Sequence, residues 1–198
     1  MQKKILKKYF NQSYWKDKTI LITGVNGFIG GNLSKKLISL GSNVIGISNE
    51  DSKNKFLIYE NIDKKIINYK LDLRSYNSIK YVTLKHKIDI CFHLAAQVDV
   101  NKAKLDPFTT FESNIRGTYN LLEVLRNTDS IKSIVMASSD KAYGEYPKKD
   151  LPYLEDYSLK AIYPYDVSKA AADMIAKSYA SNLFNLPVIT TRFSNIYG

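Results

Sequence analysis

The sequence predicts an α/β fold, a doubly wound parallel sheet with helices on both faces, and three observations support that prediction. Short apolar runs rich in β-branched residues alternate with segments of helical periodicity. The apolar runs are continuous rather than alternating, which is typical of parallel strands covered on both faces. A glycine-bearing turn at residues 24–30 joins the first apolar run to the first helical segment, as in dinucleotide-binding folds.

The expected elements follow in chain order. Strands are expected at residues 19–23, 43–47, 65–71, 88–93, 131–137 and 187–193. Helices are expected at residues 28–40, 75–85, 109–126 and 165–182, and Gly41 stands where a glycine commonly ends a helix. Right-handed crossovers between these strands give a doubly wound sheet. The polar segment 146–160 is long enough to act as a binding loop or lid.

Length and composition indicate one domain with a substantial core, since 44% of the 198 residues are hydrophobic. We expect residues 1–16 to form a basic N-terminal arm and residues 17–198 to form the domain. No apolar run reaches the roughly 18 residues that a membrane span needs, and no apolar stretch follows the basic N-terminus as in a signal peptide. A cytoplasmic protein without membrane contact is therefore expected.

The formal net charge of +10 raises the question of nucleic-acid binding. The lysines are spread along the chain and no arginines interleave with aromatic residues, so we expect a solvated surface and no nucleic-acid partner. Cys91 is the single cysteine, which excludes an internal disulfide, and it lies in an apolar run where burial is expected. His86 and His93 are too few for a histidine metal site and are not spaced like one, so no metal is expected.

The glycine turn reads Thr-Gly-Val-Asn-Gly-Phe-Ile-Gly over residues 23–30. Gly24 permits the turn, Gly27 lets a pyrophosphate approach the backbone, and Gly30 lets the helix pack closely on the sheet. Free N–H groups and the positive end of the helix dipole then face the phosphates. The flanking strand and helix supply the structural context that a glycine pattern alone lacks.

The second strand is expected to end on the residue that reads the adenosine ribose. That residue is Ser48, with Glu50 and Asp51 just beyond it. An acidic side chain there favours NAD and a nearby positive charge favours NADP. Serine discriminates poorly, but no arginine is close, so NAD is favoured over NADP.

A tyrosine four residues before a lysine places both side chains on one helical face, where the ammonium lowers the pKa of the phenol toward working pH. Such a tyrosine can act as a general base or acid beside a nicotinamide. The spacing occurs four times, so it decides nothing by itself; the pairs are Tyr14/Lys18, Tyr76/Lys80, Tyr81/Lys85 and Tyr165/Lys169. Only the last pair follows the fifth strand.

The fifth strand is expected to deliver Ser138, Ser139 and Asp140 to the ligand crevice at the carboxyl ends of the strands. A serine hydroxyl, Tyr165 and Lys169 would converge there. The sequence therefore predicts a site that oxidises a hydroxyl group.

The motifs TGVNGFIG, LDLR, FHLAAQ, SSDKAYGE, YPYDVSK and RFSNIYG occur in the order and spacing of the extended short-chain dehydrogenases. From about residue 14 to residue 198, the chain resembles this NAD-dependent epimerase/dehydratase family, with its Rossmann fold. The resemblance is greatest to nucleotide-sugar 4,6-dehydratases similar to CDP-glucose 4,6-dehydratase, because the SDK of SSDKAYG is similar to their motif.

The resemblance implies residue roles. Ser139 would bind the sugar hydroxyl, Tyr165 would be the base, Lys169 would hold the tyrosine and the nicotinamide ribose, and Asn195 would contact the substrate near its diphosphate. The implied cofactor contacts are Gly24, Asn26, Gly27, Phe28, Ile29, Gly30, Ser48, Asp72, Leu73, Ala95, Ala96, Gln97, Asn114, Tyr165 and Lys169.

The resemblance also implies a reaction, in which sugar C4 is oxidised by NAD+ and water is eliminated across C5–C6. Asp140 would protonate the departing C6 hydroxyl. Many dehydratases have a glutamate as the C5 base where this chain has Lys141. Lys141 either acts with a lowered pKa or forms only an ion pair, and both alternatives stay open.

Three functional alternatives remain at this point: a dehydratase, a 4-epimerase or other sugar-nucleotide oxidoreductase, and a non-catalytic dinucleotide-binding protein. The expected partner is a nucleotide-diphospho-sugar, and a homodimer through the two long helices is possible. Relatives continue beyond RFSNIYG with a smaller C-terminal substrate domain, which we expect to be largely absent here.

Overall fold

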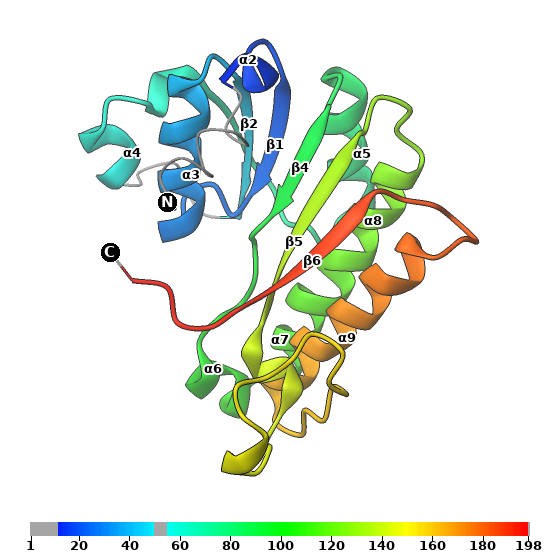
Figure 1. Ribbon diagram of the computed structural model, residues 1–198. Coiled ribbons are helices and arrows are strands. Elements are labelled where there is room, and N and C mark those ends of the chain that lie inside the picture. The colour runs from blue at the N-terminus through cyan, green and yellow to red at the C-terminus, as the bar shows by residue number, and fades with distance from the viewer. Residues whose placement is uncertain (1–11, 50–54, 198) are drawn as a thin grey trace, which may run out of the picture.

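The computed structural model describes residues 12–49 and 55–197. It contains one six-stranded sheet in the order β3-β2-β1-β4-β5-β6, and all adjacent strands are parallel (Figure 1). The strands are β1 (Thr19–Thr23), β2 (Asn43–Ser48), β3 (Ile66–Lys70), β4 (Ile90–His93), β5 (Ser133–Ser139) and β6 (Val188–Phe193). The predicted doubly wound α/β fold is confirmed.

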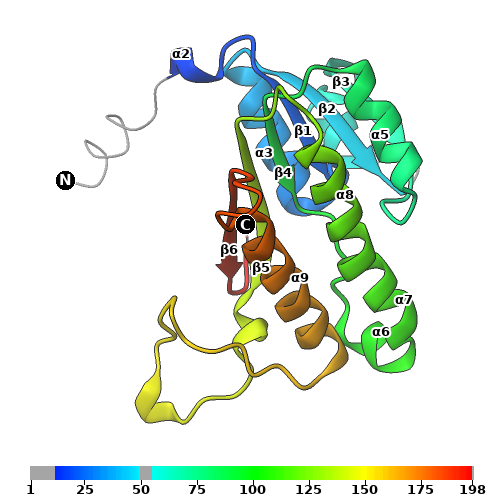
Figure 2. The ribbon, with the colours of Figure 1, turned by 90° about the vertical axis from the view of Figure 1, so that its right-hand side faces the viewer.

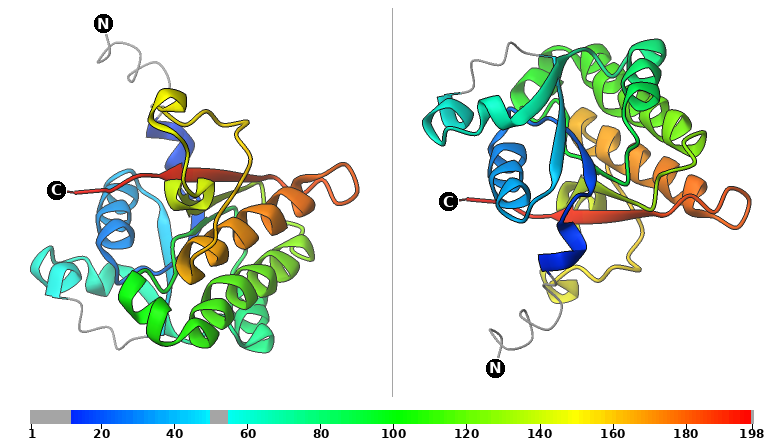
Figure 3. Two further views of the ribbon diagram at one scale, coloured as in Figure 1. Left: turned by 90° about the horizontal axis from the view of Figure 1, so that it is seen from below. Right: turned by 90° about the horizontal axis from the view of Figure 1, so that it is seen from above.

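Helices cover both faces of the sheet. They are α2 (Gln12–Trp15), α3 (Phe28–Ser39), α4 (Lys55–Tyr59), α5 (Tyr76–Lys85), α6 (Val100–Leu105), α7 (Pro107–Phe111), α8 (Gly117–Arg126) and α9 (Pro164–Ala180). Helices α3 and α4 lie on one face, and α5, α8 and α9 lie on the other (Figures 2 and 3). Among the described residues, no helix combines the length and the apolar character needed to cross a membrane.

Two apolar clusters form the core, one on each face. In β1, Ile20 and Ile22 point toward α3 and pack with Leu37, whereas Leu21 points toward α8 and packs with Leu121. These five side chains are at most 2% exposed. Because both faces of β1 are covered, its sequence is continuously apolar, which explains why the expected strand bounds 19–23 are correct.

Several predicted bounds are wrong by one or two residues, and one helix differs more. The segment expected as a single helix at 109–126 begins at Pro107, where the Asp106 carboxylate caps the helix by accepting from the N–H of Thr109. It then passes through a π-helical turn, Glu112–Arg116, before α8. A π turn holds one extra residue per turn, so helical periodicity along the sequence does not reveal it.

The N-terminal part of the described chain packs against the domain. Trp15, which falls within the expected arm, packs against the apolar cluster beside α3 and stacks on Phe92 with ring centroids 6.4 Å apart. The Ser42 hydroxyl donates to the Trp15 carbonyl at 2.7 Å. Residues 1–11, the rest of the expected arm, lie outside the described residues.

Candidate active site

The strand order reverses beside β1, because β2 and β3 lie on one side of it and β4, β5 and β6 on the other. In doubly wound sheets, ligands bind at the carboxyl ends of the strands where the order reverses. That point lies between Thr23 at the end of β1 and His93 at the end of β4, which are register partners. The predicted site residues stand at the carboxyl ends of strands, follow those ends, or belong to helices packed beside them.

Gly24 fixes the turn after β1. Its φ is +72°, and a Cβ atom there would lie 2.9 Å from the Ala95 nitrogen. Its own N–H donates to the Ile47 carbonyl at 2.8 Å, which ties the turn to β2. Both the backbone conformation and the close approach of β4 therefore require glycine.

The other two glycines bring α3 close to the turn. A Cβ atom on Gly30 would lie 2.9 Å from the Val25 Cα, and one on Gly27 would lie 3.2 Å from the Gly24 carbonyl oxygen. Gly27 caps α3, so the first N–H groups of the helix, at Phe28 and Ile29, point toward the turn at the N-terminal end of α3. This arrangement offers a cradle for a phosphate, and its close packing depends on the absence of side chains at Gly24 and Gly30.

Asn26 belongs to this turn, and a residue of the sheet holds its side chain. The side-chain amide of Asn68, on β3, donates to the Asn26 Oδ1 at 3.1 Å. Gly46 leaves room for this pair, since a Cβ atom there would lie 3.1 Å from the Asn68 Oδ1 and 2.7 Å from the Val25 side chain. The position of Asn26 is thus set by β2 and β3.

Ser48 is the last residue of β2 and is 7% exposed. The structure therefore places it at the predicted strand end, as a buried side chain. Glu50 and Asp51, which bear on the choice between NAD and NADP, lie outside the described residues.

Asp72 and Leu73 follow β3 and have different environments. The Asp72 carboxylate accepts from Nε and Nη2 of Arg74 at 2.8 and 2.6 Å, and these hydrogen bonds lower its pKa. Leu73 is buried against Gly117, where a Cβ atom would lie 3.2 Å away. The Asn120 amide donates to the Leu73 carbonyl at 3.0 Å, so α8 sets the shape of this turn.

Ala95, Ala96 and Gln97 follow β4 and are held by side chains of other elements. The Ala95 N–H donates to the Thr23 hydroxyl at 3.2 Å. The Gln97 N–H donates to Oδ1 of Asn114 at 2.7 Å, and the Asn114 amide donates back to the Gln97 carbonyl at 3.0 Å. Asn114 is 3% exposed, so the structure gives it a positioning role, and its direct cofactor contact remains a prediction.

The end of β5 brings Ser139 together with the acidic and basic residues that follow it. The Ser139 hydroxyl donates to Oδ1 of Asp140 at 3.2 Å and accepts from the Lys141 N–H at 3.2 Å. Asp140 and Lys141 open the short 3-10 helix Asp140–Tyr143. Ser139 thereby fixes the direction of the two residues expected to act on C5 and C6.

Tyr165 lies on the first turn of α9, near enough to Ser139 for the serine hydroxyl to affect its pKa. Burial raises the pKa of Tyr165, the Ser139 hydrogen bond lowers it, and the carboxylates of Asp166 and Asp140 raise it further. The net direction is upward. The expectation that Lys169 lowers the pKa of Tyr165 is therefore wrong for this structure, because burial outweighs the favourable interactions.

Lys169 is 8% exposed and its Nζ donates to the Ala137 carbonyl at 2.6 Å. Burial lowers its pKa to about 8, with an opposing contribution from the Asp173 carboxylate. The side chain thus points into the sheet end at β5. The structure brings Ser139, Tyr165 and Lys169 to one place, as the sequence predicted.

Asn195 follows β6 and is exposed. Three residues before it, Arg192 binds both oxygens of the Asp173 carboxylate at 2.8 and 3.0 Å. Arg192 also donates to the Tyr143 hydroxyl and to the Glu155 carbonyl, each at 2.8 Å. Sequence reasoning missed this clamp, which joins β6, α9 and the turn that carries Asp140.

The segment predicted as a binding loop, residues 146–160, is packed by its own tyrosines and by Tyr143, and it projects beyond the carboxyl ends of the strands (Figure 2). Tyr143 stacks on Tyr153 with ring centroids 4.7 Å apart, and Tyr146 stacks on Tyr157 at 5.0 Å. Lys160 lies over the Tyr146 ring, 4.1 Å from its centroid. The loop therefore has a defined shape of its own.

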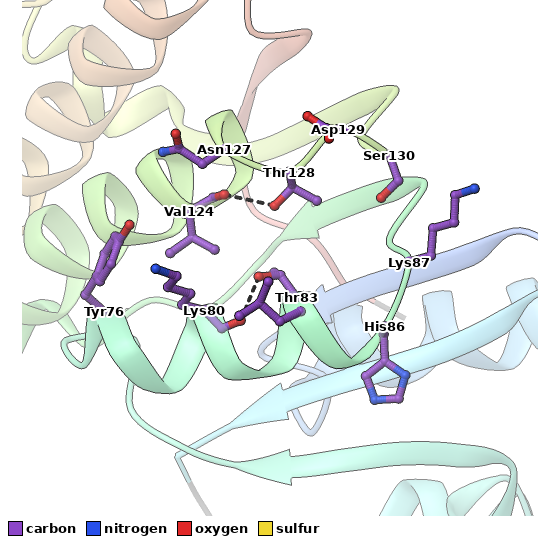
Figure 4. Close-up of a pocket in the computed structure, with 11 residues that line it drawn as sticks. Tyr76, Lys80, Thr83, His86, Lys87, Val124, Asn127, Thr128, Asp129 and Ser130 are labelled. Atoms are coloured by element: carbon purple, nitrogen blue, oxygen red, sulfur yellow. Dashed lines mark hydrogen bonds between the residues drawn. The ribbon is translucent and has the colours of Figure 1, made fainter.

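A cavity of about 760 Å³ lies at the opposite edge of the sheet (Figure 4). Tyr76 and Lys80 on α5 and residues 127–130 after α8 line it. Lys87 and Ser130, which precede β4 and β5, place it at the amino ends of the strands. None of the predicted catalytic residues lines this cavity. Within residues 12–49 and 55–197, no cluster of histidine, cysteine and acidic side chains fit to hold a metal ion is found.

Comparison with known proteins agrees with this site. The family model described as GDP-mannose 4,6 dehydratase matches residues 21–198. CDP-paratose 2-epimerase of Salmonella typhi is 33% identical over 198 residues, covering 90% of this chain and 57% of that protein. CDP-glucose 4,6-dehydratase of Salmonella typhimurium is 28% identical over 177 residues, covering 88% of this chain and 49% of that protein.

A solved structure has the same fold: the UDP-glucose 4-epimerase of Thermus thermophilus in complex with NAD. It has a TM-score of 0.81 and 29% identity, covering 91% of this chain and 56% of that chain. The expectation of NAD agrees with this relative, and the chain spans about half the length of the relatives described here. The chain therefore belongs to the GDP-mannose 4,6 dehydratase family of nucleotide-sugar dehydratases and epimerases.

Proposed function

We propose that this chain forms the NAD-binding and catalytic part of a nucleotide-sugar 4,6-dehydratase. The observation that carries the proposal is the junction of Asp140 with the Ser139–Tyr165 pair. Oxidation of C4 needs the serine, Tyr165 and Lys169, whereas elimination of water also needs an acid beside them. Asp140 supplies that acid, because the Ser139 hydroxyl holds its carboxylate at the same strand end.

The residues around the glycine turn fit a dinucleotide, since Gly24 and Gly30 let the turn, the segment after β4 and the start of α3 approach one another closely at the strand ends. When bound, NAD+ would accept a hydride from sugar C4 and return it to C6. Tyr165 would take the proton of the C4 hydroxyl, and Ser139 would orient that hydroxyl. Lys169 would hold the nicotinamide ribose.

Elimination needs a base at C5 and an acid at C6. Asp140 would pass a proton to the departing C6 hydroxyl, which leaves as water. The C5 proton would pass to Lys141 or to another base nearby, and C5 would take a proton back when the hydride returns to C6. Asp166 is close enough to Lys141 and Asp140 for their charges to alter its pKa, which burial raises. It is therefore the second base to test.

The first experiment is calorimetric titration of the 198-residue chain with NAD+ and, separately, with NADP+. Saturable binding, tighter for NAD+, is the expected result. The second is incubation of the chain with NAD+ and CDP-glucose or other nucleoside-diphosphate glucoses. A 4-keto-6-deoxy sugar supports dehydration and should disappear in Asp140→Asn, while a C4 epimer alone rejects dehydration.

The alternative is a 4-epimerase, and Lys141 favours it because a glutamate base is missing. Replacement of Lys141 by glutamate separates the two. In a dehydratase whose lysine acts on C5, K141E still forms the 4-keto-6-deoxy product. The pH dependence of its rate then reflects the pKa of a carboxylate in place of that of a lysine. In a 4-epimerase, K141E forms no dehydrated product and still interconverts the C4 epimers.

If the chain binds a dinucleotide and Tyr165→Phe changes no cofactor-dependent activity, the third alternative, a non-catalytic binding protein, is correct. A homodimer through α8 and α9 and a cytoplasmic location stay predictions. Sedimentation of the chain at several concentrations tests the first of these.

A further inference from the structure

His93 is a buried polar residue to which the mechanism above gives no role. It ends β4, is 4% exposed, and lies at the point where the strand order reverses. Its Nδ1 is 2.7 Å from the Thr23 hydroxyl on β1, and its Nε2 is 3.0 Å from the Thr118 hydroxyl on α8. Burial, reinforced by the charge of Lys169, lowers its pKa to about 3, so the ring is neutral at ordinary pH.

The neighbouring hydrogen bonds decide which nitrogen of His93 carries the proton. The Thr118 hydroxyl donates its single proton to the main-chain carbonyl of Asn114 at 2.6 Å. Toward His93, Thr118 can then only accept, so Nε2 carries the proton and Nδ1 is bare. Nδ1 accepts from the Thr23 hydroxyl, whose oxygen accepts from the Ala95 N–H at 3.2 Å.

The chain of hydrogen bonds continues from Asn114 to the catalytic helix. The Asn114 amide donates to Gln97 and also to the Ser168 hydroxyl at 2.9 Å. Ser168 donates to the carbonyl of Tyr165 at 2.6 Å. Asn114 lies in the π-helical turn, a feature that is frequent at functional sites and here gives the side chain its reach.

We infer that His93 is a positioning residue that joins the glycine turn to the catalytic helix through two buried runs of hydrogen bonds that meet at Asn114, whose main-chain carbonyl accepts from Thr118 and whose side-chain amide donates to Ser168. The first run leads from Thr23, next to Gly24, through His93 to the π-helical turn, and the second leads from there to Tyr165. An unpaired polar group in this dry interior is costly, so each member holds its neighbour in one orientation. The dinucleotide turn and the first turn of α9 are thereby kept in register.

The test compares two isosteric substitutions, Thr118→Val and Thr83→Val. Both threonines are buried on helices and donate to a main-chain carbonyl of the preceding turn. Thr83 is on α5, beside the cavity in Figure 4 and away from the site, so T83V is the matched control. T118V breaks the His93 chain, whereas T83V removes only a local hydrogen bond.

The first readout is NMR of the imidazole nitrogens and the side-chain amides, and it needs no ligand. We expect His93 to be neutral with its proton on Nε2 between about pH 5 and pH 8, the range around the ordinary pKa of histidine. We expect T118V to shift the signals of His93 and of the Asn114 amide, and T83V to leave both in place. A proton on Nδ1, a titration near neutral pH, or an unchanged Asn114 amide in T118V would overturn the inference.

The second readout is the affinity for NAD+, and this part rests on the proposed function. We expect T118V to weaken binding about fivefold to tenfold, the loss of roughly one buried hydrogen bond. T83V should keep the parental affinity even where its melting temperature falls equally. An equal loss of affinity in both variants would mean that His93 contributes only to the stability of the core and does not position the dinucleotide turn. If the parent binds no dinucleotide, the proposed function fails, while the NMR readout still decides the inference.

Discussion

Two tyrosine–lysine pairs with identical spacing have opposite environments in this molecule. On α5, Tyr81 is 58% exposed and the Lys85 ammonium lies in solvent over the rings of Tyr69 and Tyr81, 5.7 and 5.8 Å from their centroids. The interaction with Tyr69, followed by that with Tyr81, raises the pKa of Lys85. On α9, Lys169 is buried and its pKa falls to about 8.

The difference shows that spacing sets only which face of a helix two residues share. Both pairs satisfy that condition, yet α5 turns its pair away from the strand ends, whereas α9 lays Lys169 against the end of β5 at Ala137. A buried ammonium pays a desolvation cost that an exposed one avoids. Such a cost is characteristic of functional sites, so burial distinguishes the two lysines where sequence spacing cannot.

The largest expected effect is on the rate of the oxidation step. Tyr165→Phe removes the phenolic hydroxyl proposed to exchange the proton of the C4 hydroxyl, and should slow NAD+-dependent oxidation of a nucleotide sugar by about 10²- to 10⁴-fold, the usual contribution of general acid–base catalysis. Tyr81→Phe is the matched control and should keep the parental rate. The formation of reduced nicotinamide measures both. Equal rates in the two variants would place the base elsewhere.

The next largest effect is expected on the free energy of unfolding, through the ion pair that holds α9 to β6. Arg192→Leu leaves the Asp173 carboxylate, which is 4% exposed in the pair, without its partner and should lower the free energy of unfolding by about 3 kcal/mol. Arg74→Leu breaks the exposed pair with Asp72, where the side chains are 43% and 41% exposed, and should cost at most about 1 kcal/mol. Urea denaturation measures both. Similar losses of unfolding free energy in the two variants would show that the Arg192–Asp173 pair stabilises the fold no more than an exposed ion pair does.

A smaller effect concerns the cost of the buried lysine itself. The pKa of Lys169 is about 8 in the folded chain against the ordinary 10.5, so the unfolded chain binds more protons between these values and the stability of the parent rises with pH across that window. Lys169→Met removes the cost and should be more stable than the parent by roughly 2 to 3 kcal/mol below pH 8, a gain that shrinks toward pH 10.5.

Denaturation of the parent and K169M at several pH values tests this prediction. K169M should at the same time lose affinity for NAD+, since stability is exchanged for function at such a site. A constant difference in stability across the pH range would mean that Lys169 keeps an ordinary pKa in the folded chain.

The smallest effect is expected at the surface pair. Lys85→Met should leave the melting temperature and the affinity for NAD+ unchanged, because the ammonium is fully solvated. A thermal scan and a calorimetric titration check this. A loss of dinucleotide binding in K85M would show that α5 takes part in the site and would remove the contrast between the pairs.

Those site residues could be predicted whose type and whose place at the end of an expected strand or helix can both be recognised in a short stretch of sequence. Gly24, Gly27 and Gly30 stand between a strand and a helix, and the close approaches in the structure exclude a side chain at Gly24 and Gly30 and make a tight contact at Gly27. Ser139 and Tyr165 follow the ends of the expected elements and meet there. The members of the His93 chain could not be predicted as a unit, because Thr23, His93 and Asn114 are far apart in the sequence and carry no shared pattern.

The sequence by itself determined the parallel sheet and the carboxyl edge at which the chemistry gathers, because continuous apolar strands and a glycine turn are local patterns. The tertiary structure alone decided which lysine is buried, in which direction the pKa of Tyr165 moves, and that Arg192 binds Asp173. These properties depend on desolvation and on distances between groups of remote elements. Such quantities exist only once the helices have packed on the sheet.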